Sequence, residues 1–169
     1  QSGGCIEVES KPGRGATFKI YFPRVESAAT ETESVAVGGD SVRGRETVLL
    51  VEDEPGVRRL VNETLRLHGY TVLEARHGIE ALLTGAKHAG PIHLLLTDVV
   101  MPQMSGPEVA EKLATVRPEV KVLYMSGYPD HPAFSKGGID TEHSFLQKPF
   151  TPTTLAQKVR EVLDGSKVA

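Results

Sequence analysis

The sequence has little cysteine, no excess of positive charge and no long apolar run, and each shortage excludes a class of protein. Its single cysteine, Cys5, cannot form an internal disulfide, which favours a reducing cytoplasm. The 19 basic residues are outnumbered by 22 acidic ones, so no basic face is available for a row of nucleic-acid phosphates. No apolar run approaches the roughly 20 residues that a membrane-spanning helix needs. We therefore expect a cytoplasmic chain that binds no nucleic acid and makes no direct membrane contact.

A start signal is also missing. The chain begins with Gln1 rather than Met and shows no charged start followed by an apolar stretch. We therefore expect a piece of a longer protein, whose preceding part could attach to a membrane. The 169 residues leave room for one well-buried domain and about forty residues of something smaller.

The first 45 residues divide into two parts. Runs of alternating polarity at Cys5–Glu9 and Thr17–Tyr21 flank a loop that contains glycine, which is typical of a β-hairpin. The following stretch is rich in Ser, Thr, Glu and Gly and has no periodic apolar face. We predict a hairpin segment over residues 1–25, a flexible linker over residues 26–45 and the main domain over residues 46–166.

In the main domain, short apolar runs alternate with segments whose apolar residues recur at helical spacing. This alternation is typical of βαβ units that build a parallel sheet. The predicted strands are Val48–Val51, Tyr70–Ala75, Ile92–Leu96, Val120–Met125 and Phe145–Leu146. The helical stripes are Val57, Leu60, Val61 and Leu65; Ile79, Leu82, Leu83 and Ala86; Val109, Leu113 and Val116; and Leu155, Val159, Val162 and Leu163. The predicted fold class is α/β, a doubly wound five-stranded parallel sheet of the flavodoxin-like (βα)5 kind.

Several helix ends carry their own signals. Ser105 and Glu108 have the spacing of a capping box, and Thr151 followed by Pro152 marks the start of the last helix. Between residues 127 and 141, prolines and a glycine pair leave room for no more than about two helical turns. We predict a short or irregular fourth helix there.

Polar residues stand where the predicted strands end. Glu52 and Asp53 follow the first strand, Asp98 the third and Ser126 the fourth, and Lys148 follows the fifth. Because parallel strands bring their carboxyl ends to one edge of a sheet, these residues should converge. Crowded carboxylates repel one another, and Mg²⁺, which prefers carboxylate oxygens and water, relieves this. We predict that the three acids bind Mg²⁺, that Asp98 is the nucleophile toward a phosphoryl group, and that Lys148 and Ser126 contact its oxygens.

Each of these residues also has an ordinary structural explanation. The acids at 52–54 could begin a helix, Asp98 could cap one, and Lys148 and Ser126 could belong to ordinary loops. Their joint occurrence at one sheet edge favours a functional site. The six histidines show no ligand-like spacing, so we expect them to be surface or structural residues and not phosphodonors.

Four segments resemble the signature motifs of response-regulator receiver domains. They are VEDE at 51–54, LLLTDVVMPQMSG at 94–106, YMSGY at 124–128 and FLQKPF at 145–150, and the resemblance spans residues 46–164. It implies a phosphorelay receiver that takes a phosphoryl group from the phosphohistidine of a histidine kinase or histidine phosphotransfer domain. Transfer would depend on Mg²⁺ and would switch the conformation of the chain, which we expect to be a monomer or weak dimer.

The resemblance also implies roles for individual residues. Asp98 would be the phosphoacceptor, and Glu52 would stand where the family often has Asp. The implied metal ligands are Glu52, Asp53, Asp98 and the Val100 main-chain carbonyl, the implied switch residues are Ser126 and Phe145, and the implied phosphate-binding residue is Lys148. A cis peptide bond between Lys148 and Pro149 is predicted, because the turn must direct the ammonium group back to the site.

The leading segment, QSGGCIEVESKPGRGATFKIYFPR, resembles the end of the ATP-binding domain of sensor histidine kinases. The nucleotide-contacting motifs of that domain are absent from the sequence. The resemblance implies that the parent protein is a hybrid histidine kinase with a carboxyl-terminal receiver, and that this chain has no kinase activity itself.

Two other functions share features with the receiver. A Mg²⁺-dependent phosphohydrolase with an aspartyl nucleophile would share the sheet edge and the aspartyl phosphate, but that class has a second acid where this sequence has Val100. A binding module that had lost phosphorylation would not need the complete set of acids with Ser126 and Lys148. The receiver function is therefore favoured.

Overall fold

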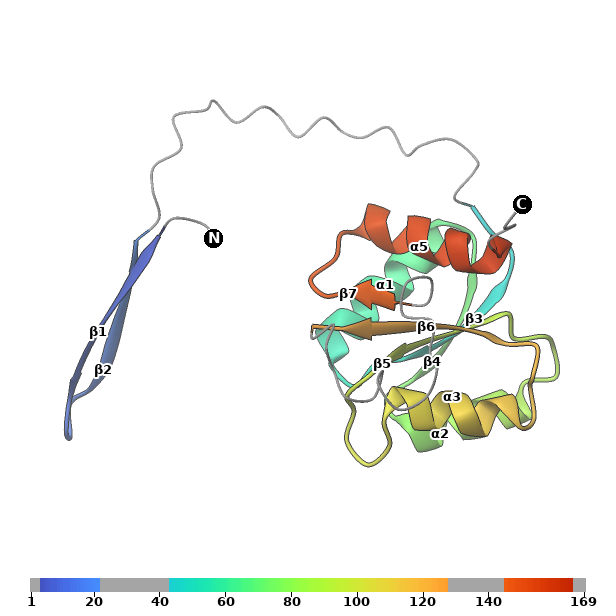
Figure 1. The fold of residues 1–169 in the computed structure, drawn as a ribbon, viewed down its shortest axis with the longest axis horizontal. Coiled ribbons are helices and arrows are strands. Elements are labelled where there is room, and N and C mark those ends of the chain that lie inside the picture. The colour runs from blue at the N-terminus through green and yellow to red at the C-terminus, as the bar shows by residue number, and fades with distance from the viewer. Residues whose placement is uncertain (1–3, 22–42, 128–144, 166–169) are drawn as a thin grey trace, which may run out of the picture. The chain divides into compact units, whose positions relative to one another are not determined.

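The computed structural model describes residues 4–21, 43–127 and 145–165. The chain divides into two compact units, Gln1–Gly38 and Gly39–Ala169. The first unit holds the hairpin and the second holds the main sheet with its helices (Figure 1). Most of the predicted linker and nearly all of the predicted fourth-helix region lie outside the described residues, as do His131 and His143.

The hairpin predicted in the first unit is confirmed. Strands β1 (Cys5–Lys11) and β2 (Gly15–Tyr21) pair antiparallel, with Cys5 opposite Tyr21 and Lys11 opposite Gly15. The connecting turn uses Gly13 and Gly15 at φ values of 74° and 78°, where a side chain would be strained. Every residue of both strands is exposed within the unit.

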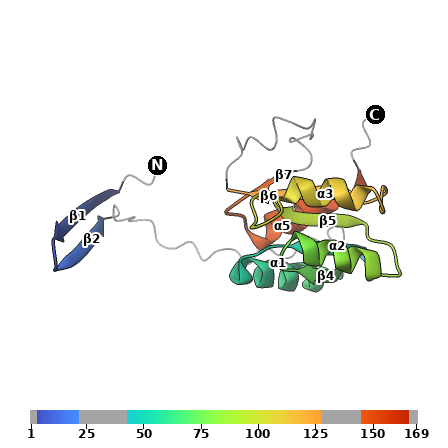
Figure 2. The same cartoon turned by 90° about the horizontal axis from the view of Figure 1, so that it is seen from below.

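The main sheet has the predicted doubly wound topology. Its five parallel strands are β3 (Thr47–Val51), β4 (Thr71–Ala75), β5 (Leu94–Asp98), β6 (Lys121–Ser126) and β7 (Phe145–Gln147), in the order β4-β3-β5-β6-β7. Helices α1 (Pro55–Leu67) and α5 (Pro152–Asp164) cover one face, and α2 (Gly78–Lys87) and α3 (Gly106–Ala114) cover the other (Figures 1 and 2). The strand order reverses between β3 and β5, which is the place where this fold binds ligands.

The two central strands supply the core on both faces of the sheet. Every residue of β3 is buried, and so are the first four residues of β5. Val48 and Leu50 pack toward α1 and α5, whereas Leu49 and Val51 pack toward α2 and α3. This burial on both faces explains why the strands read as continuous apolar runs without polar alternation.

The predicted apolar stripe of α2 is wrong in part. Ile79 and Leu83 are 48% and 54% exposed, and Ala86 is exposed as well. The buried face consists of Gly78, Ala81 and Gly85. A Cβ at Gly85 would lie 2.9 Å from Leu113 Cδ1 of α3, so small residues let the two helices pack closely. The spacing of large apolar residues therefore predicted the wrong face of α2, because the residues that pack there are small. Leu60 and Val116 of the other stripes are likewise exposed.

The predicted helix ends are confirmed where the structure describes them. Glu108 accepts hydrogen bonds from the Ser105 main-chain N–H at 2.8 Å and from its hydroxyl at 2.6 Å. Thr151 accepts from the Thr154 N–H at 3.1 Å, and Pro152 begins α5. None of the helices in the described ranges combines the length and apolar character needed to cross a membrane.

Gly106 fixes the distance between α3 and the end of β5. Its N–H donates to the Val99 carbonyl at 3.0 Å, and a Cβ at this position would lie 2.2 Å from the Asp98 carbonyl oxygen. The clash is with backbone, which cannot rotate away.

We predict that Gly106→Ala lowers the free energy of unfolding by about 1–3 kcal/mol, because the added methyl group must push α3 away from β5. Gly56→Ala is the control, since a Cβ there would make an ordinary contact at 3.5 Å. Urea denaturation measures both variants. Equal midpoints for Gly106→Ala and wild type would show that α3 can shift without cost.

Candidate functional site

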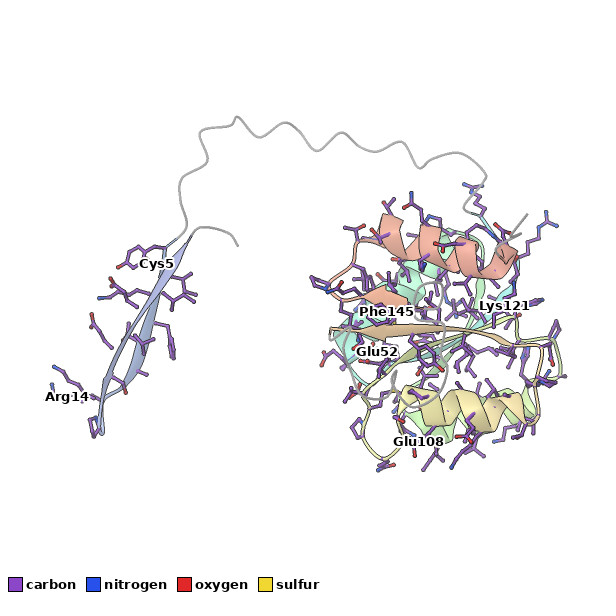
Figure 3. The ribbon with its side chains drawn as sticks, viewed as in Figure 1. Cys5, Arg14, Glu52, Glu108, Lys121 and Phe145 are labelled. Carbon is purple, nitrogen blue, oxygen red and sulfur yellow. The ribbon has the colours of Figure 1, made fainter. Side chains whose placement is uncertain are left out.

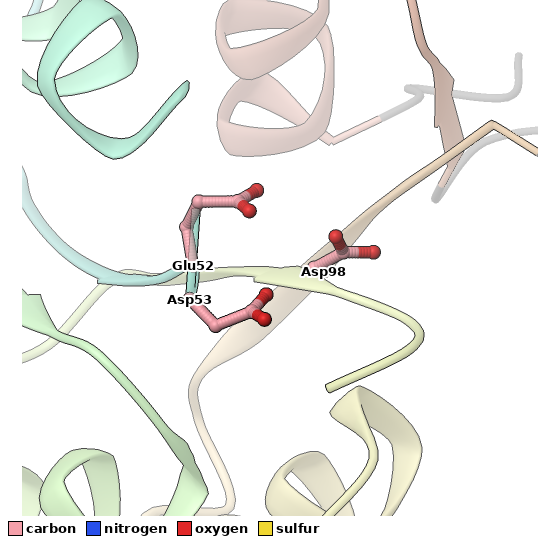
Figure 4. Close-up of side chains that lie close together, drawn as sticks. All are labelled: Glu52, Asp53 and Asp98. Atoms are coloured by element: carbon pink, nitrogen blue, oxygen red, sulfur yellow. The ribbon is translucent and has the colours of Figure 1, made fainter. Parts of the chain in front are cut away.

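Three carboxylates gather where the strand order reverses. Glu52 and Asp53 follow β3, and Asp98 ends the neighbouring strand β5. One oxygen from each lies within 4.8 Å of the others. Figure 4 shows the carboxylates of Glu52 and Asp53 both pointing toward the side of Asp98. Glu52 is buried, Asp98 is half-buried and Asp53 is exposed, so the cluster could hold a metal ion that keeps some of its water.

In the structure, residues other than Glu52, Asp53 and Asp98 begin and cap the helices. Glu54 alone caps α1, since its side chain accepts from the Gly56 N–H at 3.4 Å. Glu52 turns inward and accepts from the Glu54 N–H at 3.2 Å. Asp98 ends a strand, and the residue that precedes α3 is Ser105. The helix starts are therefore served by other residues.

Lys148 joins two of the carboxylates. Its Nζ lies 2.7 Å from Glu52 Oε2 and 2.7 Å from Asp98 Oδ2. Its main-chain N–H donates to the Ser126 carbonyl at 2.8 Å, which attaches the segment after β7 to the end of β6. The predicted cis bond between Lys148 and Pro149 is confirmed. Residues from three separate strand ends thus meet through one ammonium group.

Burial and ion pairing act on this cluster in opposite directions. Burial raises the pKa of Glu52, although the hydrogen bond and charge of Lys148 oppose the shift. Burial also lowers the pKa of Lys148, but its hydrogen bonds to Asp98 and Glu52 outweigh this, and the pKa is raised overall. Lys148 is therefore a cation at neutral pH. One ammonium group faces three carboxyl groups, which leaves an excess of negative charge suited to a divalent cation.

Of the remaining predicted residues, Ser126 and Val100 lie at the same edge, and Phe145 begins the outer strand β7. Ser126 ends β6 and is 2% exposed, and the Val100 N–H donates to Asp98 Oδ1 at 3.3 Å. Phe145 begins β7 opposite Tyr124 of β6 and is half-buried. Figure 3 places Glu52 at the end of the sheet opposite the one that carries Lys121. Ser126 follows Met125, which pairs with Asp98, whereas Phe145 is one strand further out.

One contact to the acids was not predicted from the sequence. Arg58 Nη1, from the first turns of α1, donates to the carbonyl oxygens of Glu52 at 2.7 Å and Asp53 at 3.2 Å. The position of Arg58 in the sequence could have indicated this contact. Side chains of a helix point back toward its amino end, and the turn that bears the acids lies at the amino end of α1.

Comparison with known proteins identifies the family. Residues 48–160 match the response regulator receiver domain. Sensor kinase CckA of Brucella abortus is 39% identical over 172 aligned positions, which cover 97% of this chain but only 18% of that protein. A chemotaxis protein CheY homolog of Campylobacter jejuni is 34% identical, with 69% of this chain covering 91% of its length. The solved receiver domain of the hybrid histidine kinase CckA is 38% identical with a TM-score of 0.58, over 69% of this chain and 98% of that one.

The chain therefore belongs to the response regulator receiver domain family. Its fold, its sheet order and the acidic cluster at the reversal point agree with that membership. It is a receiver of two-component phosphorelay signalling.

We predict that Glu52→Gln stabilises the metal-free chain at neutral pH. Because the pKa of Glu52 is raised in the folded state, its charged form favours unfolding. The wild-type residue therefore supports folding below its ordinary pKa of 4.5, and this support is lost as the pH rises through the folded-state pKa.

Thermal unfolding at neutral and acidic pH measures the effect. The variant should melt above wild type at neutral pH without metal, and the gap should narrow in acid. Saturating Mg²⁺ should stabilise wild type more than the variant, because binding to the folded state alone raises stability. A variant that melts below wild type at neutral pH without Mg²⁺ would show that the pair with Lys148 outweighs the cost of burial.

Proposed function

We propose that Asp98 is the phosphoacceptor, and that Mg²⁺ is held by Glu52, Asp53, Asp98 and the Val100 main-chain carbonyl. The observation that carries this proposal is the cluster of three carboxylates bridged by Lys148 at 2.7 Å from both Glu52 and Asp98. The donor set is made of hard oxygen ligands with one exposed acid, which suits a cation that retains water.

The reaction proceeds by direct displacement. An oxygen of Asp98 attacks the phosphorus of a phosphohistidine, the bond from phosphorus to the imidazole nitrogen breaks, and the imidazole leaves with the electron pair. Bound Mg²⁺ would neutralise charge on the transferring group. Lys148 exchanges one carboxylate for a phosphoryl oxygen, so the ammonium group already at the site also pairs with the incoming group.

The switch follows from the same exchange. The Ser126 hydroxyl donates to a phosphoryl oxygen, and Phe145 repacks beside it. Two features support this assignment: Ser126 is nearly buried at the end of β6, next to the strand of Asp98, and β7 is a short strand whose following segment is attached to Ser126. A shift at Ser126 therefore reaches β7 and the segment after it directly.

The parent protein is proposed to be a hybrid histidine kinase, with residues 1–25 as the end of its ATP-binding domain, 26–45 as a linker and 46–166 as the receiver. The alignment with sensor kinase CckA covers 97% of this chain, so it extends beyond the receiver into the hairpin. Cross-strand pairs Ile6–Ile20 and Val8–Phe18 leave an exposed apolar face on that hairpin. Because a two-stranded hairpin is marginally stable alone, a hairpin with such a face suits a larger sheet whose other elements cover that face.

Phosphorylation with a small-molecule donor tests the proposal. We expect wild type, incubated with acetyl phosphate and Mg²⁺, to gain the mass of one phosphoryl group, and Asp98→Asn to gain none. Chelation of the metal should abolish the gain in wild type. Phosphorylation that persists in Asp98→Asn would refute the assignment, and many turnovers of a phosphate monoester would point to the phosphohydrolase.

The hairpin is predicted to be dispensable for phosphorylation. A chain that begins at Gly39 retains two contacts. The Gly44 N–H donates a hydrogen bond to the His68 carbonyl at 3.0 Å, and Glu46 forms an ion pair with Arg160 at 2.8 Å. This chain should be phosphorylated as fast as the full chain. A chain beginning at Thr47 loses both contacts and should melt at a lower temperature. A folded chain from Gly39 that accepts no phosphate would mean that the hairpin takes part.

A further inference from the structure

The backbone of the acidic turn, residues 52–54, is held from two sides. On one side the Glu52 N–H donates to the Ala75 carbonyl of β4 at 3.2 Å. On the other side Arg58 Nη1 donates to the carbonyls of Glu52 and Asp53 at 2.7 Å and 3.2 Å. These two residues supply two of the three carboxylates of the cluster. Arg58 is thus bound to the main chain that carries most of the acid set.

Arg58 is itself fixed in place. Its side chain is 16% exposed, and its Nε lies 3.9 Å from Glu74 Oε2 on β4. Glu74 in turn accepts a hydrogen bond from the Asn62 amide of α1. The guanidinium group is therefore held between the helix, the neighbouring strand and the acidic turn, which leaves it little freedom to point elsewhere.

The chemistry of this contact differs from that of Lys148. Lys148 occupies carboxylate oxygens, so a metal or a phosphoryl group must compete with it. Arg58 binds carbonyl oxygens of the main chain and places a positive charge behind the acids while leaving their carboxylates available. A charged donor shared between two successive carbonyls fixes both peptide planes, and these planes set the directions in which the side chains of Glu52 and Asp53 leave the backbone.

We propose that Arg58 is a positioning residue for the divalent-metal site. By holding the acidic turn, it keeps two mutually repelling carboxylates in the arrangement that the cation needs before the cation arrives. This inference rests on the proposed function, because it presupposes that the acid cluster binds Mg²⁺. It adds a residue that makes no contact with the metal or with the phosphoryl group.

The test compares Mg²⁺ affinity in Arg58→Met, Arg58→Lys and wild type, measured by calorimetric titration. Arg58→Met retains most of the unbranched stem of the side chain but loses the guanidinium group and its hydrogen bonds. We expect its dissociation constant to rise about tenfold, as the loss of a charged hydrogen bond predicts. Arg58→Lys retains the charge and a donor, so it should recover part of the affinity. At saturating Mg²⁺ the phosphorylation rate of Arg58→Met should approach that of wild type, because the bound cation then orders the turn itself.

Arg59→Met is the matched control. Arg59 is the next residue of α1, carries the same charge and has a side chain that is 81% exposed, and it pairs with Glu63. Its loss should leave Mg²⁺ affinity within about twofold of wild type, since an exposed charge is strongly screened.

The possible results separate the two proposals. Wild type that binds no Mg²⁺ would refute the metal site on which the inference rests. Wild-type binding with equal dissociation constants in Arg58→Met and Arg59→Met would overturn the inference and leave the proposed function standing. A lower melting temperature of Arg58→Met without any loss of Mg²⁺ affinity would also overturn it, by showing that Arg58 only stabilises the fold.

Discussion

The bridge from Lys148 to Glu52 and Asp98 is the interaction on which the arrangement of the site depends. A carboxylate as buried as Glu52 is costly unless a cation accompanies it, and Lys148 is the cation that the fold brings there. The same ammonium group lies 2.7 Å from Asp98, so the pairing is shared between a deeply buried acid and a more accessible one. Because Lys148 is shared between two acids, its pairing can change when a divalent cation binds the carboxylates or a phosphoryl group reaches Asp98.

Contacts to the main chain bring the groups of this bridge to their places. Because β3 and β5 are adjacent at the reversal point, Glu52, Asp53 and Asp98 meet although they come from distant parts of the chain. Gly106 sets α3 close against the Asp98 carbonyl, and the Lys148 N–H ties the last strand to Ser126. Arg58 adds a third constraint at the acidic turn. These three constraints act on the main chain and occupy no carboxylate oxygen.

Sequence reasoning predicted the strands and the acid cluster for a physical reason. Strands buried on both faces appear as uninterrupted apolar runs, and the polar residues that follow them must gather at one edge. The sequence did not reveal helix packing made by small residues, or a side chain that binds main-chain carbonyl groups. The packed face of α2 is made of Gly78, Ala81 and Gly85, which carry no apolar signal, and Arg58 binds carbonyl oxygens that no sequence motif displays. The predicted domain boundaries and the roles of the individual site residues remain predictions.

We expect the phosphoryl group transferred from a phosphohistidine to reside on Asp98 and on no other residue. Tandem mass spectrometry of the chain, phosphorylated by a phosphohistidine protein and digested at a pH that preserves the acyl phosphate, tests this most directly. The modification should map to the peptide containing residues 94–106 and, within it, to Asp98. Modification at Asp53, at Glu52 or at a histidine of this chain would contradict it.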